Sequence, residues 1–258
     1  METKNIVPHE SISLFVKNIR VFDEPYQNKK SVLPFYADGY PGLMFQETAG
    51  GLFVMPHKKK MPELFLYGQT IQPIELITDG SYQLIVFQLY PFVLKSFFNV
   101  SPKDLNDDCY DVTQLKDAGS GDLTGQLRSN KKTTDRISAI TSFLHIIFQT
   151  KKDLLDFKVR QAIQLIIDHK GQVSISDLCM QLKITQRSFE RRFLAQVGIS
   201  PKQLSKIIQF DSSLNQLNEK DYTRLTDIVY ANGFADQSHF IRVFKAFTGT
   251  TPKKFGNS

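Results

Sequence analysis

The sequence predicts an α+β protein of two domains, an antiparallel β-barrel or sandwich followed by an all-α domain. Three observations support this fold class. The first half carries short apolar runs between Gly, Pro and Asp-Gly breaks, a pattern typical of strands. From residue 137 onward, apolar residues recur at three- and four-residue steps, which is typical of helices. The last part of the chain also contains an internal repeat, in which residues 186–204 resemble residues 237–255.

The β-rich domain is expected over residues 1–118. Its clearest strand candidates are the apolar runs at 43–45, 52–54, 64–67 and 84–87. Between residues 104 and 132 the apolar content drops, and Gly119, Gly121 and Gly125 lie close together, which is typical of a connector. We therefore expect a domain boundary there.

A linker with one long helix is expected over residues 119–156. Its apolar residues share one stripe of the helix and are Ile137, Ile140, Leu144 and Ile147. The stripe has two interpretations: the helix covers its own barrel, or it forms the seam of a homodimer. A further helix over 157–169, ended by Lys170-Gly171, opens the all-α domain of residues 157–258.

Charge is divided unevenly between the two halves. Residues 1–150 hold 15 Lys and Arg against 16 Asp and Glu, whereas residues 151–258 hold 17 against 10. A basic half indicates a polyanionic partner, either nucleic acid or an anionic membrane surface. The start of the chain lacks the apolar core of a signal peptide, and the most apolar stretch, residues 82–98, is broken by Gln88, Pro91 and Lys95. We therefore expect neither export nor a membrane span.

The repeat has a constant offset of 51 residues and matches chemistry as well as hydrophobicity. The paired positions are Gln186 and Gln237, Phe189 and Phe240, Arg191 and Arg242, Phe193 and Phe244, Gly198 and Gly249, Ser200-Pro201 and Thr251-Pro252, and Lys202 and Lys253. Each copy predicts a helix with aromatic residues on one face and Arg on another. Glycine ends that helix, and Ser-Pro or Thr-Pro opens the next.

A short helix precedes each copy, so each unit reads helix, turn, helix. The first unit covers about 174–198, where Ser174 and Asp177 form a capping box and Thr185 caps the second helix. The second covers about 225–249, with its turn at Asn232-Gly233. This is the helix-turn-helix arrangement.

The segment from about residue 160 to Phe255 resembles the DNA-binding domain of the AraC/XylS family. The strongest match is the stretch 233–245, GFADQSHFIRVFK, followed by Gly249 and Thr251-Pro252. The resemblance implies two helix-turn-helix units, joined by a long helix over about 201–217, that set their second helices into successive major-groove segments of double-stranded DNA. It implies a cytoplasmic transcription regulator and activator without enzymatic activity or a cofactor, reading an asymmetric site, with RNA polymerase, a small-molecule effector and a second copy of the chain as further partners.

Two groups of residues are expected to contact DNA. Side chains at the recognition positions would read base edges, since guanidinium groups pair with guanine and amides with adenine. These are Arg187, Glu190, Arg191, Gln237, Ser238, His239 and Arg242. Others would contact phosphate, where positive charge supplies affinity without sequence preference. These are Thr185, Arg192, Lys202, Lys245, Lys253 and Lys254.

Three positions depart from the family pattern. Lys183 stands in the first turn where glycine is common, Ala235 replaces the usual Ser cap of the second recognition helix, and Gln209 replaces an Arg of the linking helix. Asp236 is expected to cap instead. These changes are expected to leave the fold intact.

The N-terminal half resembles, more faintly, the cupin-like sensory or dimerising barrels of the same family. His9 and His57 are the histidines before the linker and form no His-x-His pair, so no metal site is expected. The run 57–60 is expected to be a solvated loop rather than an anion-binding patch. Candidates for a ligand pocket, with core packing as the alternative, are Tyr40, Phe45, Phe65 and Tyr67. The residues that would bind an effector stay unassigned.

Two rival classes follow from the same residues. In one, the barrel serves only for dimerisation or contact with another protein. In the other, the chain is an enzyme with a DNA-binding tail, as in proteins that transfer alkyl groups to cysteine. That chemistry requires an activated thiol or a metal-thiolate cluster. Cys109 and Cys179 are the two cysteines and lie far apart in the chain, and Cys109 stands alone in the first domain, as is typical of a reduced intracellular protein.

Overall fold

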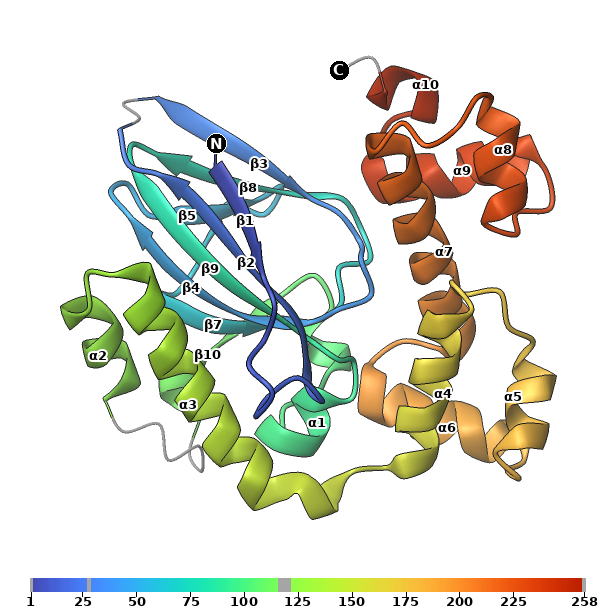
Figure 1. Ribbon diagram of the computed structural model, residues 1–258, viewed down its shortest axis with the longest axis horizontal. Helices are drawn as coiled ribbons and strands as arrows, with labels where there is room; N and C mark the ends of the chain where they lie inside the picture. Colours follow the sequence, from blue (N-terminus) through green and yellow to red (C-terminus); the bar gives the residue numbers. More distant parts are fainter. Residues whose placement is uncertain (1, 27–28, 116–121, 257–258) are drawn as a thin grey trace.

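Strands form most of the first half of the molecule, drawn in blue and cyan in Figure 1. The computed structural model describes residues 2–26, 29–115 and 122–256. The strands are β1 (Glu2–Ile6), β2 (Val16–Glu24), β3 (Lys30–Phe35), β4 (Gly42–Thr48), β5 (Leu52–Met55), β6 (Lys59–Lys60), β7 (Leu64–Tyr67), β8 (Ile74–Asp79), β9 (Tyr82–Leu89) and β10 (Cys109–Asp111). Residues 59–60, predicted to lie in a loop, therefore pair with β5, and Lys59 forms an ion pair with Asp108.

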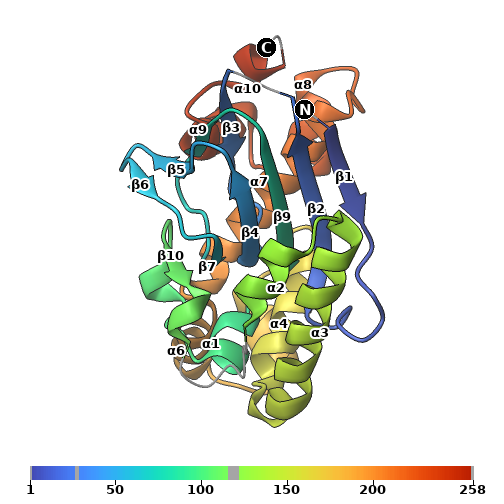
Figure 2. The same cartoon turned by 90° about the vertical axis from the view of Figure 1, so that its left-hand side faces the viewer.

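Within the described residues, these strands form two antiparallel sheets. One has six strands in the order β1-β2-β9-β4-β7-β10, and the other has four in the order β3-β8-β5-β6. Figure 2 shows α1 (Val93–Phe98) and α3 (Thr133–Lys151) below the strands and α8 (Leu225–Ala231), α9 (Gln237–Thr248) and α10 (Pro252–Phe255) above them. Together with the helical C-terminal half, this arrangement confirms the predicted α+β fold class.

Side chains along each strand of the six-stranded sheet point alternately to its two faces, and both faces are buried. Met44 and Val86 share one apolar cluster with Leu52 and Leu76 of the four-stranded sheet. Their neighbours Leu43, Phe45, Ile85 and Phe87 point the other way and pack in a second cluster with the helices of this domain.

The helices of the first domain cover that second face. They are α1 (Val93–Phe98), α2 (Leu123–Ser129), α3 (Thr133–Lys151) and the short 3-10 helices η1 (Lys103–Leu105), η2 (Val112–Gln114) and η3 (Lys152–Leu154). On α3, the side chains of Ile140, Leu144 and Ile147 are buried in the same cluster as the barrel residues. The stripe thus packs on its own barrel, which supports the first of its two interpretations.

Part of the predicted connector is structured. It contains β10 and α2, and a buried arginine fixes α2 and α3 to the sheet. Arg136 donates hydrogen bonds to the carbonyl oxygens of Leu127 (3.1 Å) and Asn130 (2.8 Å) and to Oε1 of Gln83 (2.7 Å). Residues 116–121, with Gly119, Gly121 and the predicted boundary after residue 118, lie outside the described residues.

Up to residue 256, where the described part ends, the C-terminal half contains helices and no strands. The helices are α4 (Phe157–Asp168), α5 (Ile175–Gln181), α6 (Gln186–Val197), α7 (Pro201–Asn218), α8 (Leu225–Ala231), α9 (Gln237–Thr248) and α10 (Pro252–Phe255). Figure 1 shows α5 and α6 at one end of the long helix α7, and α8, α9 and α10 at the other. None of the helices in the described part of the chain is both long and apolar enough to cross a lipid bilayer.

Candidate DNA interface

Side-chain caps start the helices of both helix-turn-helix units. In the first unit, Oγ of Ser174 accepts a hydrogen bond from the backbone N–H of Asp177, and Oγ1 of Thr185 accepts one from the N–H of Ser188, both at 3.4 Å. In the second unit, Asp236 accepts from the N–H of His239 at 2.7 Å. This confirms that Asp236 caps α9 where the family pattern has the cap at position 235.

The aromatic face of each second helix is core. Phe189, Phe193, Phe240 and Phe244 have no exposed surface. Their ring centroids lie 5.5 Å apart in α6 and 5.6 Å apart in α9, in edge-to-face contact. These four phenylalanines hold α6 and α9 to their units, which fixes the opposite faces toward solvent.

The opposite faces present two equivalent exposed stripes. On α6 the stripe contains Arg187 and Arg191, and on α9 it contains Ser238 and Arg242, all of them exposed. Members of each pair are four residues apart, so they lie one above the other along the helix. A second helix with an exposed guanidinium at its centre has the shape and the donors to enter a DNA major groove.

Three further predicted base contacts lie beside these stripes. Gln237 is exposed at the start of α9. Glu190 is also exposed, and its carboxylate accepts a hydrogen bond from Nε2 of Gln186 at 2.9 Å. His239 differs, because it is half-buried, its ring centroid lies 5.7 Å from that of Phe234, and its Nδ1 is buried without a hydrogen-bond partner. Part of His239 therefore supports the turn instead of facing outward.

Most of the predicted phosphate contacts are exposed, but Arg192 is bound to a carboxylate of the chain. The exposed residues are Thr185, Lys202, Lys245, Lys253 and Lys254. Arg192, in contrast, is half-buried and forms two hydrogen bonds of 2.8 Å with the carboxylate of Asp156, the residue that caps α4. Its guanidinium ties α6 to α4, which argues against a contact with phosphate.

The sequence patterns did not predict two exposed apolar residues beside the turns. Met180 and Tyr230 are each 74% exposed, and they occupy equivalent places near the ends of α5 and α8, 50 residues apart. Extending the repeat alignment upstream of Gln186, with the one-residue difference in the turns, would have found the pair. They give each unit an apolar side chain next to its turn.

The aromatic residues proposed for a barrel pocket do not come together. Phe65 and Tyr67 line a cavity of about 30 Å³ between the two sheets, which has space for a water molecule or two. The guanidinium of Arg136 lies over the ring of Phe45, with its Cζ 5.0 Å from the ring centroid of Phe45. Tyr40 lines a different cavity, of about 460 Å³, between the barrel and the helical half. Among the described residues, the space between the two sheets that Phe65 and Tyr67 line is thus largely filled by side chains.

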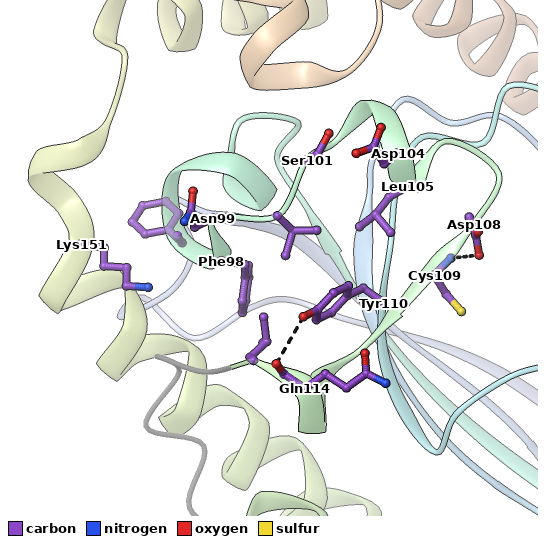
Figure 3. A pocket seen from close by; sticks show the side chains of 13 residues that line it. Phe98, Asn99, Ser101, Asp104, Leu105, Asp108, Cys109, Tyr110, Gln114 and Lys151 are labelled. Carbon is purple, nitrogen blue, oxygen red and sulfur yellow. Dashed lines mark hydrogen bonds between the residues drawn. The ribbon is translucent and has the colours of Figure 1, made fainter.

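A third, open cavity of about 560 Å³ lies at the end of the barrel between α1, η1, β10 and the end of α3. Figure 3 shows Tyr110 across its floor, donating a hydrogen bond to the carbonyl oxygen of Gln114 at 3.3 Å, with Cys109 at the edge. Burial raises the pKa of the Cys109 thiol, the opposite of what a nucleophilic cysteine needs. An alkyl-transfer reaction at Cys109 is therefore disfavoured.

Comparisons with known proteins match two separate segments of the chain. Residues 178–258 match the model of a helix-turn-helix domain, and residues 4–111 match that of a domain of unknown function (DUF6597). Uncharacterized HTH-type transcriptional regulators of Staphylococcus aureus strains MRSA252 and MSSA476 are 23% and 25% identical over 228 residues, covering 82% of this chain and 29% of either relative. The chain thus spans less than a third of the length of these curated relatives.

Two solved structures are similar in part. ToxT from Vibrio cholerae O395 is 15% identical with a TM-score of 0.49, covering 93% of this chain and 96% of that one. The C-terminal domain of AraT, a response regulator from Geobacillus stearothermophilus, is 20% identical with a TM-score of 0.36, covering 39% of this chain and 84% of that one.

Proposed function

We propose that this chain, whose residues 178–258 match a helix-turn-helix domain and resemble the AraC/XylS family, is a transcription regulator that reads an asymmetric DNA site. The observation that carries the proposal is the pair of equivalent exposed stripes on α6 and α9, with Arg191 and Arg242 at matching positions. Two readers in one protomer require two different base sequences side by side, because their neighbouring residues differ.

Base recognition follows from the side chains of each stripe. The guanidinium groups of Arg191 and Arg242 can each donate two hydrogen bonds to O6 and N7 of guanine. In the first unit Arg187 adds a second donor, whereas the second unit has Ser238 at the equivalent place. The half-site for α6 is therefore expected to be richer in guanine than the half-site for α9.

Selection of binding sites from random double-stranded DNA tests this proposal. We expect a site of two unlike blocks, spaced by about one helical turn so that both helices enter the major groove from the same face. A palindromic site, or no enrichment at all, would contradict reading by two units of one protomer.

Salt dependence tests the contribution of the exposed lysines. If Lys202, Lys245 and Lys253 contact phosphates, log Kd must rise linearly with log salt concentration, with a slope set by the number of contacts. Replacing Lys253 with Ala should weaken all sequences alike and lower that slope by about one. An affinity that does not change between low and high salt would exclude a phosphate-anchored interface.

We further propose that the regulator works in the cytoplasm as an activator that contacts RNA polymerase and is controlled by a small ligand. The space between the two sheets is largely filled, so a ligand larger than water needs another site, and the cavity of about 460 Å³ between the domains is one that both domains line. A ligand of the native state must raise the melting temperature. A melting-temperature screen of small metabolites therefore tests this part, and a reporter gene carrying the selected site tests activation.

The largely filled space between the sheets also favours a second role for the first domain, in which it assembles the chain into dimers or contacts another protein. Such a domain would show no ligand-dependent change in melting temperature. Its assembly would appear in sedimentation measurements of the free chain and of the chain bound to its selected site. A monomer in both conditions would exclude dimerisation as the purpose of this domain.

A further inference from the structure

One loop of the barrel domain is pressed against the long helix of the C-terminal half. Gly39, with a φ of 83°, lies so close to α7 that a methyl group built on it would be 2.7 Å from Cδ1 of Ile208 and 3.3 Å from Cδ1 of Leu204. Nε2 of Gln69 donates a hydrogen bond of 3.1 Å to the carbonyl oxygen of Gly39 and holds the loop in place. The loop around Gly39 and helix α7 therefore form a tight contact between the domains.

Each side of this contact carries a carboxyl group. Asp38 precedes Gly39, is 9% exposed, and accepts hydrogen bonds from the backbone N–H of Tyr40 at 2.8 Å and from the side-chain amide of Gln88. Asp211 lies one turn after Ile208 on α7, where Asn215 donates to it at 3.3 Å. Both aspartates line the cavity of about 460 Å³ between the domains.

Basic side chains do not fully compensate this pair. Arg20 of β2 is half-buried and lines the same cavity, but across the described residues no ion pair within 4.0 Å joins a basic group to Asp38 or Asp211. Lys17, Arg20, Tyr40 and Lys170 line the cavity together with the pair, whereas the charges of Tyr90 and Asp168 act on Tyr40. Lys17 and Lys170 are exposed to solvent and Arg20 is half-buried, so these cations compensate the buried Asp38 and the half-buried Asp211 only in part. A carboxylate with incomplete compensation in a buried site favours the uptake of a proton.

The pKa shifts of both aspartates agree with this incomplete compensation. Burial, followed by the charge of Asp38, raises the pKa of Asp211 to about 7, although Arg20, Asn215 and Lys17 lower it. Burial also raises the pKa of Asp38, against the Tyr40 N–H, Arg20 and Gln88. The closed contact therefore holds a proton close to neutral pH, whereas carboxyl groups in water hold one only below about pH 4.

We propose that the contact between the Gly39 loop and α7 is a proton-operated latch, closed while the Asp38–Asp211 pair holds a proton and loosened when both carboxylates are ionised. The closed state binds a proton that the open state releases, so the stabilisation is present in full below the ordinary aspartate pKa and is lost as the pH rises through about 7. Because α7 carries both helix-turn-helix units, the latch controls how tightly they are held against the barrel.

A distance measurement in solution tests the latch. Fluorophores are placed at the exposed positions Val32 and Lys220, one on each domain, in the full chain with Cys109 and Cys179 replaced by alanine. Energy transfer is recorded from pH 5 to pH 8.5 in enough urea to populate the open state while circular dichroism shows both domains folded. We expect the open-to-closed ratio to rise about tenfold per pH unit toward pH 7 and then to level off.

Three variants make the result specific. Asp211→Asn and Asp38→Asn each remove one titrating carboxyl group, and both should flatten the pH profile and keep the latch closed at high pH. Asp168→Asn makes the same charge change at an exposed neighbouring position and should keep the parental profile. Gly39→Ala should open the contact at every pH because its methyl group meets Ile208.

The proposal is overturned if the unsubstituted protein shows the same distances at all pH values. It is also overturned if both asparagine variants keep the parental pH dependence, since another group would then be titrating. The parental profile decides the matter even if one asparagine variant fails to fold. None of these outcomes depends on whether the chain binds DNA.

Discussion

The two helix-turn-helix units share their local geometry but differ in what surrounds them. Gly198 and Gly249 end α6 and α9 in the same left-handed conformation, with φ of 83° and 74°. A methyl group built at Gly198 would lie 2.6 Å from the carbonyl carbon of Pro102 in the barrel domain, whereas one built at Gly249 would meet nothing within 4 Å. The two equivalent glycines therefore each end a helix, but only Gly198 of the first unit also contacts the barrel domain.

Hydrogen bonds strengthen the contact of the first unit. Nδ2 of Asn106 donates to the carbonyl oxygen of Gly198 at 3.0 Å, and Oγ of Ser96 donates to Oε1 of Gln196 at 3.2 Å. On the other end of α7, Tyr36 meets Phe255 of α10 with 5.7 Å between ring centroids. The first unit is thus docked on the barrel by its own helix end, while α9 itself stays clear of it at Gly249.

The largest expected effect comes from replacing these two glycines with alanine. Both variants pay about 1–2 kcal/mol for a left-handed alanine. Gly198→Ala also forces a methyl group against the Pro102 backbone, which adds about 1–3 kcal/mol of overpacking. Urea unfolding of the two variants should therefore show a clearly larger loss of unfolding free energy for Gly198→Ala. Equal losses would mean that the first unit is not docked in solution.

A second comparison concerns the two arginine readers. Arg191→Ala and Arg242→Ala should each cost about 1–3 kcal/mol of binding free energy to the selected site, and each should relax base preference at its own position. Affinity measured on single-base variants of the site separates the two positions. If only one variant loses affinity, the other unit does not read DNA. Lys220→Ala, at an exposed position beyond the end of α7, serves as the control that should change neither.

How much of this could be predicted depends on the range of the interactions involved. The helices, caps and aromatic core of the C-terminal half depend on residues within one or two turns of each other, so the repeat predicted them well. Asp236 is an example, because Ala235 just before it has no side-chain oxygen with which to cap the helix. The docking of Gly198 on Pro102 joins residues almost a hundred positions apart, and no local pattern indicates it.

In the barrel domain, too, local patterns predicted the elements but not the contacts between distant residues. Its strand character could be predicted, but the pairing of β2 with β9 could not, because alternating apolar residues fit many partners. The stripe on α3 was ambiguous because a helix covering a sheet and a helix in a dimer repeat apolar residues at similar spacing. Asp38 and Asp211 become neighbours only after both domains are assembled, so the charged cavity had no sequence signal.

A third prediction concerns the position that the two units fill differently. Arg192 is bound to Asp156 in the first unit, and the equivalent residue of the second unit is the buried Val243. Arg192→Ala should lower the free energy of unfolding by about 1 kcal/mol, since the paired carboxylate is largely buried but the arginine is partly exposed. DNA affinity should stay within a factor of about two. A large loss of affinity without a loss of stability would instead show that Arg192 contacts phosphate.

The smallest expected effect lies in the turns. Lys183 and Gly233 occupy equivalent places with φ of 48° and 69°, so the first unit holds a lysine where the second has the residue that this conformation favours. Lys183→Gly relieves the left-handed strain but adds flexibility to the unfolded chain, so we expect a net gain below about 1 kcal/mol. Gly233→Ala should lose about 1–2 kcal/mol for a left-handed alanine, and its methyl group would also lie 2.6 Å from the Gln172 side chain, which must shift. Urea unfolding measures both, and a loss of stability in Lys183→Gly would mean that contacts of the lysine side chain outweigh the strain of its backbone.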